Sequence, residues 1–286
     1  MVRDLDRDAP DLSAILDGIA ALDADLLLLT DLDYDAGGAA LDLVHDRLDT
    51  RGSPYPYSLS LRPNTGRATG SDRDGDGRLG EPEDAEAWGR FAGQGGMALL
   101  SRVPLTLLAD FTDLRWSDLP ETRLSPEDPA PDTRRLSTGG HWVIEARTPR
   151  GPLILLAFHA TPPVFDGPED RNGRRNSDEI ALWRHWLDGR LGPRPDAPVL
   201  ILGNANLDPD RGEGLRSEIA ALLSHPALTD PLAGRATVDW TALGLGEMRV
   251  SYVLPDAALR VTDTGTTPPA DNAGPHRPVW VDLLLP

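Results

Sequence analysis

Short apolar runs that end in polar residues constrain the fold of this 286-residue chain more than any other feature. Such runs are typical of buried strands. They occur at Leu26–Leu29, Met97–Leu100, Trp142–Ala146, Leu153–Phe158, Val199–Leu202, Arg249–Leu254 and Pro278–Leu284. Between them, typical helical stretches lie at Ser13–Leu22, Ala39–Leu48, Arg175–Leu187 and Gly214–Leu223. Strands that alternate with helices predict an α/β layered sandwich.

The sequence contains no repeat and no linker long enough to separate two domains, so we predict a single domain over residues 1–286. Leu119–Thr138 is rich in Pro, Asp and Glu and is predicted to be a surface loop. No apolar run approaches the ~18 residues of a membrane-spanning helix, so we expect a soluble protein. Met1–Pro10 is acidic and lacks the apolar core of a signal peptide. A removed leader, and with it a periplasmic or secreted location, stays open.

The charge of the chain limits its partners. The formal net charge is −18, and every one of the 28 basic residues is arginine. Proteins that bind duplex nucleic acid usually offer a basic face to its phosphates, so we do not expect general nucleic-acid binding. The absence of lysine excludes Schiff-base chemistry, and the absence of cysteine excludes disulfides and Cys-ligated zinc.

Two polar segments that follow apolar runs are candidates for chemistry. Asp31 lies just after Leu26–Leu29, where a carboxylate could hold a hard cation; a polar turn leaving the sheet is the alternative. His159 follows Leu153–Phe158 and opens a Pro-rich loop, where it could meet an anionic substrate; a structural histidine is the alternative. The candidates for binding that anion are Arg171, Arg174, Arg175 and Asn176.

Three later segments also place polar side chains beside apolar runs. These side chains are Asn204 and Asn206 after Val199–Leu202, Ser251 within Arg249–Leu254, and His276, preceded by Pro275, before the last run. Taken in order, the five segments resemble those of the endonuclease/exonuclease/phosphatase family. The resemblance runs from about Leu26 to the C-terminus and is strongest at His159–Asn176, Phe91–Arg102 and Trp280–Leu283.

Within the strongest stretch, the run Thr-Pro-Pro-Val-Phe-Asp-Gly-Pro-Glu-Asp-Arg-Asn is similar to that of a bacterial subgroup of the family. The resemblance implies the deoxyribonuclease-I-like fold. This fold is a four-layer α/β sandwich, in which two mostly antiparallel β-sheets pack face to face and helices lie outside.

The resemblance also implies a metal-dependent phosphoesterase site. In that family an acid after the first core strands holds the divalent metal, and a Gly-Asp-x-Asn motif supplies a water-orienting aspartate and a phosphate-contacting asparagine. A final Asp-His pair completes the site, and an aspartate from an Arg-x-Asp-Tyr strand backs its histidine. The cation and hydrogen-bond donors stabilise phosphoryl charge, while a carboxylate or imidazole activates water. By resemblance Asp31 is the metal ligand, and His159, Asn206 and His276 are catalytic.

Several of these positions are replaced in this sequence. Asn204 stands where the water-orienting aspartate belongs, and an amide cannot accept a proton at neutral pH. Ser251 replaces the aspartate that backs His276, and Pro275 replaces the aspartate before it. Asp31 is one methylene shorter than the usual glutamate. The metal site loses negative charge, and the general base is gone.

Two hypotheses follow. In the first, the chain keeps the fold in a binding or structural role, for a phosphate-ester small molecule or an unknown protein partner. It has then lost most phosphoesterase activity, because a general base alone contributes about 10²–10⁴-fold of rate. In the second, it is an active phosphodiesterase or phosphatase with a rearranged site that binds Mg²⁺ or Mn²⁺, and Asp33, Asp35 or Asp208 supplies the missing charge. The family's opening strand has no visible counterpart before Asp11.

A separate cation site is predicted at residues 72–84, which fit the twelve-residue calcium loop. Acidic residues fall at positions one, three and five of the loop, glycine at six and glutamate at twelve. The candidate ligands are Asp72, Asp74, Asp76, Arg78 at position seven, Glu83 and Asp84. The flanks are not clearly paired helices, so we predict a structural Ca²⁺ site rather than a regulatory switch. A solvated acidic loop is the alternative.

Overall fold

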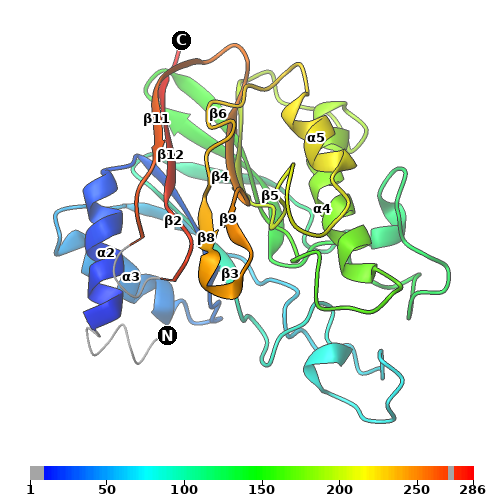
Figure 1. Cartoon of the computed structure of the whole chain (residues 1–286). Coiled ribbons are helices and arrows are strands. Elements are labelled where there is room, and N and C mark those ends of the chain that lie inside the picture. The colour runs from blue at the N-terminus through cyan, green and yellow to red at the C-terminus, as the bar shows by residue number, and fades with distance from the viewer. Residues whose placement is uncertain (1–9, 270–273) are drawn as a thin grey trace.

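Two β-sheets lie at the centre of the molecule (Figure 1). The computed structural model describes residues 10–269 and 274–286. The larger sheet has the strand order β10-β7-β6-β5-β4, and the smaller has the order β1-β3-β2. Paired strands are antiparallel except β6 and β7, which are parallel. The strands are β1 (Leu26–Leu32), β2 (Tyr57–Leu59), β3 (Gly96–Ser101), β4 (Leu105–Asp110), β5 (Gly140–Thr148), β6 (Gly151–His159), β7 (Val199–Asn204) and β10 (Ser251–Pro255).

Two hairpins and several helices complete the described chain. One hairpin pairs β8 (Val238–Trp240) with β9 (Gly246–Met248), and the other pairs β11 (Arg260–Thr266) with β12 (Val279–Leu284). The α-helices are α2 (Pro10–Leu22), α3 (Ala39–Asp49), α4 (Arg171–Leu187) and α5 (Ser217–Leu223). Short 3-10 helices occur at Pro82–Asp84, Trp116–Asp118 and Thr241–Leu243. None of the helices in the described part of the chain is long and apolar enough to cross a membrane.

Apolar cores separate the layers, because successive side chains of a strand point to opposite faces. Leu155 of β6 joins Met97 of β3 in the core between the two sheets. Phe158 of β6 lies on the other face of the larger sheet, in the core that α4 and α5 cover. Leu100 of β3 faces the core that α2 and α3 cover. The layers are therefore helices, small sheet, large sheet and helices, which confirms the predicted four-layer sandwich.

Chain connectivity brings three residues that are far apart in sequence to the same end of neighbouring strands in the larger sheet. The helix α4 is the crossover between the parallel strands β6 and β7, so the carboxyl ends of both strands lie at the same edge. The strand β10 runs antiparallel to β7, so its first residue lies at that edge too. His159, Asn204 and Ser251 are the residues that end or begin these strands.

Each predicted apolar run overlaps a strand, and each predicted helical stretch overlaps a helix. The helix α4 begins at Arg171, four residues before the predicted start, and residues 119–138 form no regular helix or strand. The prediction that the opening strand lacks a counterpart concerns residues before Asp11, nearly all of which lie outside the described residues.

Candidate active site

The three strand-end residues are direct neighbours across the larger sheet. His159 of β6 is the ladder partner of Asn204 of β7, and Asn204 is the partner of Ser251 of β10. Adjacent strands lie about 4.8 Å apart, so the three side chains share one small region. Two of the positions predicted to be degenerate, Asn204 and Ser251, therefore lie beside His159.

The two asparagines of the loop after β7 hydrogen-bond to each other. Asn204 Nδ2 donates to Asn206 Oδ1 at 3.1 Å, and Asn204 Oδ1 accepts from the backbone N–H of Asn206 at 2.9 Å. Asn206 Nδ2 donates to the carbonyl of Ala160 at 2.8 Å, which ties this loop to the end of β6. Asn206 Oδ1 is an oxygen that could bind a cation. In this structure it already accepts a hydrogen bond from the Asn204 amide.

His276 lies close enough to His159 to affect the pKa of that imidazole. Burial lowers the pKa of His159 to about 4, and the nearby His276 adds to this shift. Burial also lowers the pKa of His276, whose ring packs edge-to-face on Trp240 with centroids 5.7 Å apart. His159 Nδ1 has no hydrogen-bond partner within residues 10–269 and 274–286. Both imidazoles are neutral at pH 7.

The backbone of Pro275 is held on the β8–β9 hairpin beside the site. Its carbonyl accepts the N–H of Asp239 at 3.0 Å, and His276 forms a β-bridge with Val238. Pro275 carries no ionisable group, so this position contributes shape but no charge.

Asp31 and Asp33 gather around Gly95. Gly95 has a φ of +58°, which favours glycine; a Cβ there would lie 2.7 Å from Asp31 Oδ1, and the Gly95 N–H donates to Asp33 Oδ1 at 3.1 Å. The pKa of Asp31 is raised by desolvation of its carboxyl group, although the side chain stays exposed at one edge, and by the charge of Asp33. The backbone of Gly95 also influences the pKa of His159, so these acids border the histidines.

Two of the three acids that could restore the missing charge, Asp35 and Asp208, accept backbone N–H groups instead. Both carboxylate oxygens of Asp35 accept backbone N–H groups at the start of α3, at 3.0 and 2.9 Å. Asp208 is buried and accepts the N–H groups of Asp210, Arg211 and Arg249. Among the described residues, no group of three acidic or histidine side chains with converging ligand atoms includes Asp31.

The predicted anion-binding residues contact the protein itself. Arg174 forms a bidentate ion pair with Asp128, at 2.7 and 2.8 Å, and Arg171 Nε donates to the same carboxylate at 3.3 Å. Although Asp128 is buried, these guanidinium groups hold its pKa near 2. Arg175 is buried and donates to the carbonyls of residues 86, 135, 136 and 137.

Asn176 is fully buried and donates to the carbonyls of Thr161 and Ala205, which lie on the loops after β6 and β7. The prediction that Arg171, Arg174, Arg175 and Asn176 bind substrate stays a prediction, although Arg175 and Asn176 are buried and hydrogen-bond within the protein. The Asn176 side chain joins the loop after His159 to the loop that carries Asn206.

Glu179 is a further positioning residue, and sequence analysis missed it. Its carboxylate accepts the N–H of Thr138 at 2.5 Å and that of Thr161 at 2.6 Å, on the segments that flank His159. Glu179 lies in the middle of α4, where its sequence context gives no sign of a role. Its hydrogen bonds to Thr138 and Thr161 are what identify it. Burial raises its pKa to about 7, against the opposing effect of Arg175.

We expect the unfolding free energy to fall as pH decreases from about 6.5 to 4.5. In this window the unfolded chain binds protons at His141 and His159, whose folded pKa values burial lowers to about 3 and 4. Glu179 acts oppositely, because its folded state keeps a proton up to about pH 7. The unfolded chain thus binds two protons that the folded chain lacks, and the folded chain binds one that the unfolded chain lacks. The unfolding free energy therefore changes with a net slope on the order of 1 kcal/mol per pH unit.

Urea unfolding at several pH values, followed by tryptophan fluorescence, measures this slope. His159→Gln removes one of the two histidine contributions, so the slope should become nearly flat. A parent chain that gains stability on acidification through this window would contradict the assignment of both histidines as neutral.

The acidic loop at residues 72–84 gathers fewer side chains than predicted. Ligand atoms of Asp72, Asp74 and Asp84 lie within 4.8 Å of one another. Glu83, predicted to close the shell at position twelve, instead accepts from Trp88 Nε1 at 3.2 Å. Asp84, the other residue predicted to close the shell, lies in the converging group, whereas Asp76 lies outside it.

The remaining contacts of this loop are internal. Asp72 accepts the N–H groups of Gly75 and Gly77 at 2.7 and 2.8 Å. Asp84 accepts those of Arg73 and Gly80 at 2.7 and 2.8 Å. The side chain of Arg78 is exposed and pairs with Glu81 at 3.3 Å, so Arg78 could contribute only its carbonyl.

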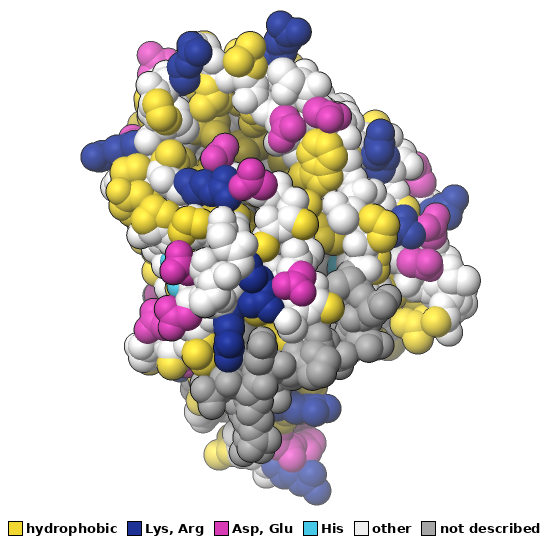
Figure 2. Space-filling view, turned by 90° about the vertical axis from the view of Figure 1, so that its left-hand side faces the viewer, with side chains coloured by type: hydrophobic (Ala, Val, Ile, Leu, Met, Phe, Trp, Pro, Cys, Tyr) yellow, Lys and Arg dark blue, Asp and Glu magenta, His cyan; other side chains and the backbone are white. Residues whose placement is uncertain are grey.

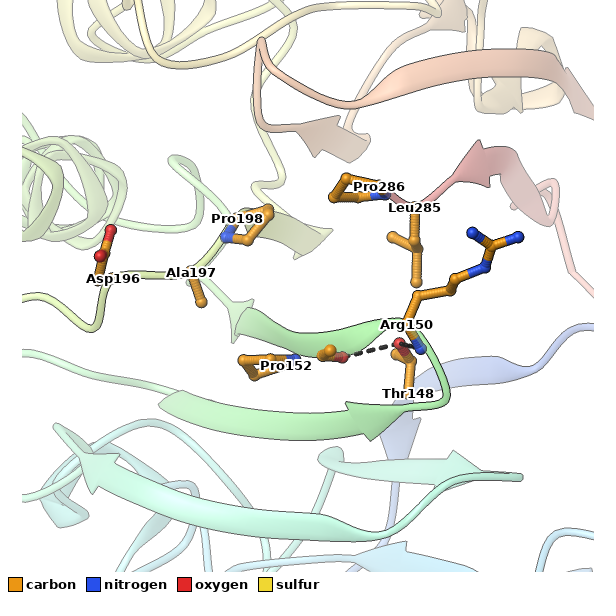
Figure 3. Close-up of a pocket in the computed structure, with 9 residues that line it drawn as sticks. Thr148, Arg150, Pro152, Asp196, Ala197, Pro198, Leu285 and Pro286 are labelled. Carbon is orange, nitrogen blue, oxygen red and sulfur yellow. Dashed lines mark hydrogen bonds between the residues drawn. The ribbon is translucent and has the colours of Figure 1, made fainter.

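Two small surface pockets lie away from His159 and His276. One, of about 110 Å³, is lined by the β5–β6 turn, Asp196–Pro198 and the C-terminal residues (Figure 3). It lies at the first residue of β6, whereas His159 is the last, about 26 Å along the strand. The other, of about 150 Å³, is lined by residues 32–36 and includes Asp33.

Comparison with known proteins identifies the family of the chain. A model of the Endonuclease/Exonuclease/phosphatase family matches residues 3–280. The chain belongs to this family. It is similar in structure to an endonuclease/exonuclease/phosphatase from Beutenbergia cavernae, with a TM-score of 0.64 and 15% identity over 96% of this chain and 66% of that one. The chain thus spans about two thirds of the length of that protein.

Two further structures are similar over most of both chains. A family protein from Leptotrichia buccalis has a TM-score of 0.56 at 13% identity, covering 96% of this chain and 93% of that one. A mannosyl-6-phosphatase from Bacteroides thetaiotaomicron has a TM-score of 0.51 at 13% identity, covering 99% and 94%. At these identities the likeness shows the fold alone. No curated protein matches the chain.

Proposed function

We propose that this member of the endonuclease/exonuclease/phosphatase family is a binding protein for a small phosphate ester and has lost phosphoester turnover. The proposal rests on the uncharged side chains at the ends of β7 and β10, where the family has aspartates. Asn204 lies beside Ser251, and its amide donates to Asn206 Oδ1, where a water-orienting carboxylate and a cation would act. Asn and Ser side chains can donate hydrogen bonds to phosphate oxygens but cannot take a proton from water.

The positions of the other acids support the proposal. Asp35 and Asp208 are each committed to two or three backbone N–H groups, and moving either would break those bonds. Asp31 and Asp33 alone would then face a divalent ion, because both lie beside Gly95. Residues Asp31 and Asn206 could still hold Mg²⁺ or Mn²⁺ weakly, and such an ion would polarise a phosphoryl oxygen.

A direct test is hydrolysis of 4-nitrophenyl phosphate and bis(4-nitrophenyl) phosphate in millimolar Mg²⁺ or Mn²⁺. We expect rates near the uncatalysed background. The double variant His159→Ala, His276→Ala is the matched control for a contaminating phosphatase. Metal-dependent turnover that disappears in this variant would establish the active alternative instead. Calorimetric titration with inorganic phosphate tests the binding role separately.

We further propose that the cluster of Asp72, Asp74 and Asp84 holds a structural Ca²⁺ ion. Three carboxylates in one loop suit a hard cation with oxygen ligands, and the loop's carbonyls could complete its shell. The loop is joined to the body of the protein by Arg73, whose buried guanidinium lies 3.2 Å from Glu86. Ordering this loop should therefore stabilise the fold rather than the loop alone.

A further inference from the structure

Arginines in this acidic protein commonly lie beside carboxylates. Seen from the side of α2 and α3, exposed arginines lie among acidic side chains (Figure 2). Arg102, for example, pairs with Asp23 and Asp25 at 2.6 and 3.7 Å. Such pairing is expected in a chain with 46 acidic residues and 28 arginines. A buried group of arginines with too few carboxylates therefore requires a separate explanation.

Three guanidinium groups are buried together where the loop at residues 72–86 meets residues 130–137 and α4. They belong to Arg73, Arg134 and Arg175, each of which is no more than 6% exposed. Burial lowers the pKa of Arg134 to about 9, and the charges of Arg175 and Arg73 add to this shift. The three positive charges therefore lie close enough to repel one another.

The carboxylates of this region are fewer than its guanidinium groups. Glu86 lies 3.2 Å from Arg73 Nη2 and also accepts from a second arginine at 3.2 Å. Asp128 is shared in the same way by two arginines of α4. Glu179 lies near Arg175, but burial raises the pKa of Glu179 to about 7 and so reduces its negative charge. Positive charge is therefore left without a matching carboxylate.

Two of the buried arginines also have unused hydrogen-bond donors. Arg73 Nε and Nη1 are shielded from solvent and have no hydrogen-bond partner within residues 10–269 and 274–286. Arg134 donates from Nε to the carbonyl of Pro129 at 3.3 Å, and the described chain offers no partner to its two Nη groups. Arg175, by contrast, donates to four backbone carbonyls. Buried charged donors without a partner are strongly unfavourable, so a partner from outside the chain is expected.

The unused donors define the chemistry of that partner. Guanidinium groups carry no acceptor, so the partner must accept hydrogen bonds. Water could do so, but it would leave the positive charge uncompensated, whereas an anion satisfies both requirements. Arg73 and Arg134 each offer two nitrogens, and such a fork matches two oxygens of one oxyanion. With exposures of 5% and 6%, these side chains are open to a small ion and not to a nucleotide or a protein segment.

We propose that a small oxyanion of the phosphate or sulfate class binds between Arg73 and Arg134. The ion joins the two loops that carry these arginines and offsets the repulsion between them. This site is separate from the strand ends, because neither arginine forms a hydrogen bond or ion pair with His159, His276 or Asn206 in the described part of the chain. The proposal does not depend on the proposed loss of turnover.

The test is differential scanning calorimetry of the full chain in sodium sulfate or sodium phosphate, with ionic strength held constant by sodium chloride. We expect each oxyanion to raise the melting temperature, by about 5 °C at a hundredfold excess over its Kd, and chloride to do less. Comparison of the two arms shows which oxyanion the site prefers. Because both ions also stabilise proteins by exclusion from their surfaces, variants are needed to identify the specific effect.

Arg134→Gln separates an anion site from an arginine with a purely structural role. Glutamine can still donate to the Pro129 carbonyl, but it removes a charge that repels Arg73 and Arg175. Without oxyanion this variant should melt at least as high as the parent, and its oxyanion affinity should be at least tenfold weaker. Arg67→Gln is the matched control, since Arg67 pairs with Asp113 at 2.8 Å and should leave the oxyanion effect unchanged.

Three results would overturn the proposal. The first is an equal oxyanion effect in Arg134→Gln and the parent, which would reduce it to a general salt effect. The second is an effect that survives in Arg134→Gln but disappears in the double variant His159→Ala, His276→Ala, which would place the ion at the strand ends. The third is independent of whether Arg134→Gln folds. Equilibrium dialysis of the histidine double variant with radiolabelled sulfate and phosphate should give one bound ion per chain, and no bound ion of either kind would contradict the site.

Discussion

Millimolar Ca²⁺ is expected to raise the melting temperature of this chain by about 5 °C, and EDTA to reverse the shift. A ligand at a hundredfold excess over its Kd adds about 2.7 kcal/mol to the unfolding free energy, and each kcal/mol moves the melting temperature of a domain of this size by about 2 °C. Mg²⁺ should do much less, because it needs a tighter octahedron and releases water reluctantly. Differential scanning calorimetry with and without each ion measures the effect.

Variants distinguish the observed cluster from the twelve-residue calcium loop. Asp72→Asn with Asp74→Asn removes two converging charges but keeps oxygen acceptors for the loop's N–H groups, so the Ca²⁺ shift should disappear while the fold persists. Glu83→Gln is the matched control, since Glu83 contacts Trp88 rather than the cluster. Loss of the shift in Glu83→Gln would restore the ligand set predicted from sequence. A parent melting curve that ignores Ca²⁺ would leave only a solvated acidic loop.

The effect of Ca²⁺ on the stability of the whole fold would pass through the contacts of Arg73. Arg73 follows Asp72 directly and is buried, with its guanidinium near Glu86. Glu86 also accepts from Arg135 Nη1 at 3.2 Å, and its carbonyl accepts from Arg175 of α4. Breaking such a buried pair leaves an uncompensated charge, so the loop cannot leave its place without cost to the body of the protein.

The layers could be predicted from sequence because buried strands reveal themselves by composition. Leu153–Phe158 and Val199–Leu202 are apolar at every position, since both of their faces lie in cores. The strand β11 was missed because it lies in an exposed hairpin and is mostly polar. The strand β4 was missed although it is apolar, because its neighbours along the chain gave no helix-and-turn pattern to mark it.

The site could be predicted only as far as residue types allow. His159, Asn204 and Ser251 meet because β6, β7 and β10 are neighbours, and that strand order is not visible in the sequence. Arg174 was expected beside His159 because it is close in sequence. The helix α4 instead turns it toward Asp128, which lies 46 residues away in the chain. Distant partners of this kind decide the role of a charged side chain, and one sequence does not identify them.

Asn204→Asp combined with Ser251→Asp and Pro275→Asp is expected to raise Mg²⁺ affinity at least tenfold. The physical reason begins with Asn204, whose amide now donates to Asn206 Oδ1. An aspartate there would set two oxygen acceptors against each other, and a cation between them relieves that repulsion. Residue 251 is the ladder partner of residue 204, so its new carboxylate would lie on the next strand. A unit charge pair at 4 Å gains about 1 kcal/mol even in water, and about 1.4 kcal/mol gives the tenfold change.

Isothermal titration calorimetry with Mg²⁺ and Mn²⁺ measures this gain, and the neutral variant Ser251→Asn, Pro275→Asn is the matched control for altered packing. Equal affinity in the charged and neutral variants would mean that these three positions do not converge on one ion. Restored hydrolysis is a separate outcome, because turnover also requires the two histidines in a productive state. Burial holds both imidazoles neutral at pH 7, so a charged partner at residue 251 should raise the pKa of His276 and move it toward the range in which it can exchange protons. A pH–rate profile of the triple variant therefore tests whether replacement of carboxylates alone accounts for the proposed loss of turnover.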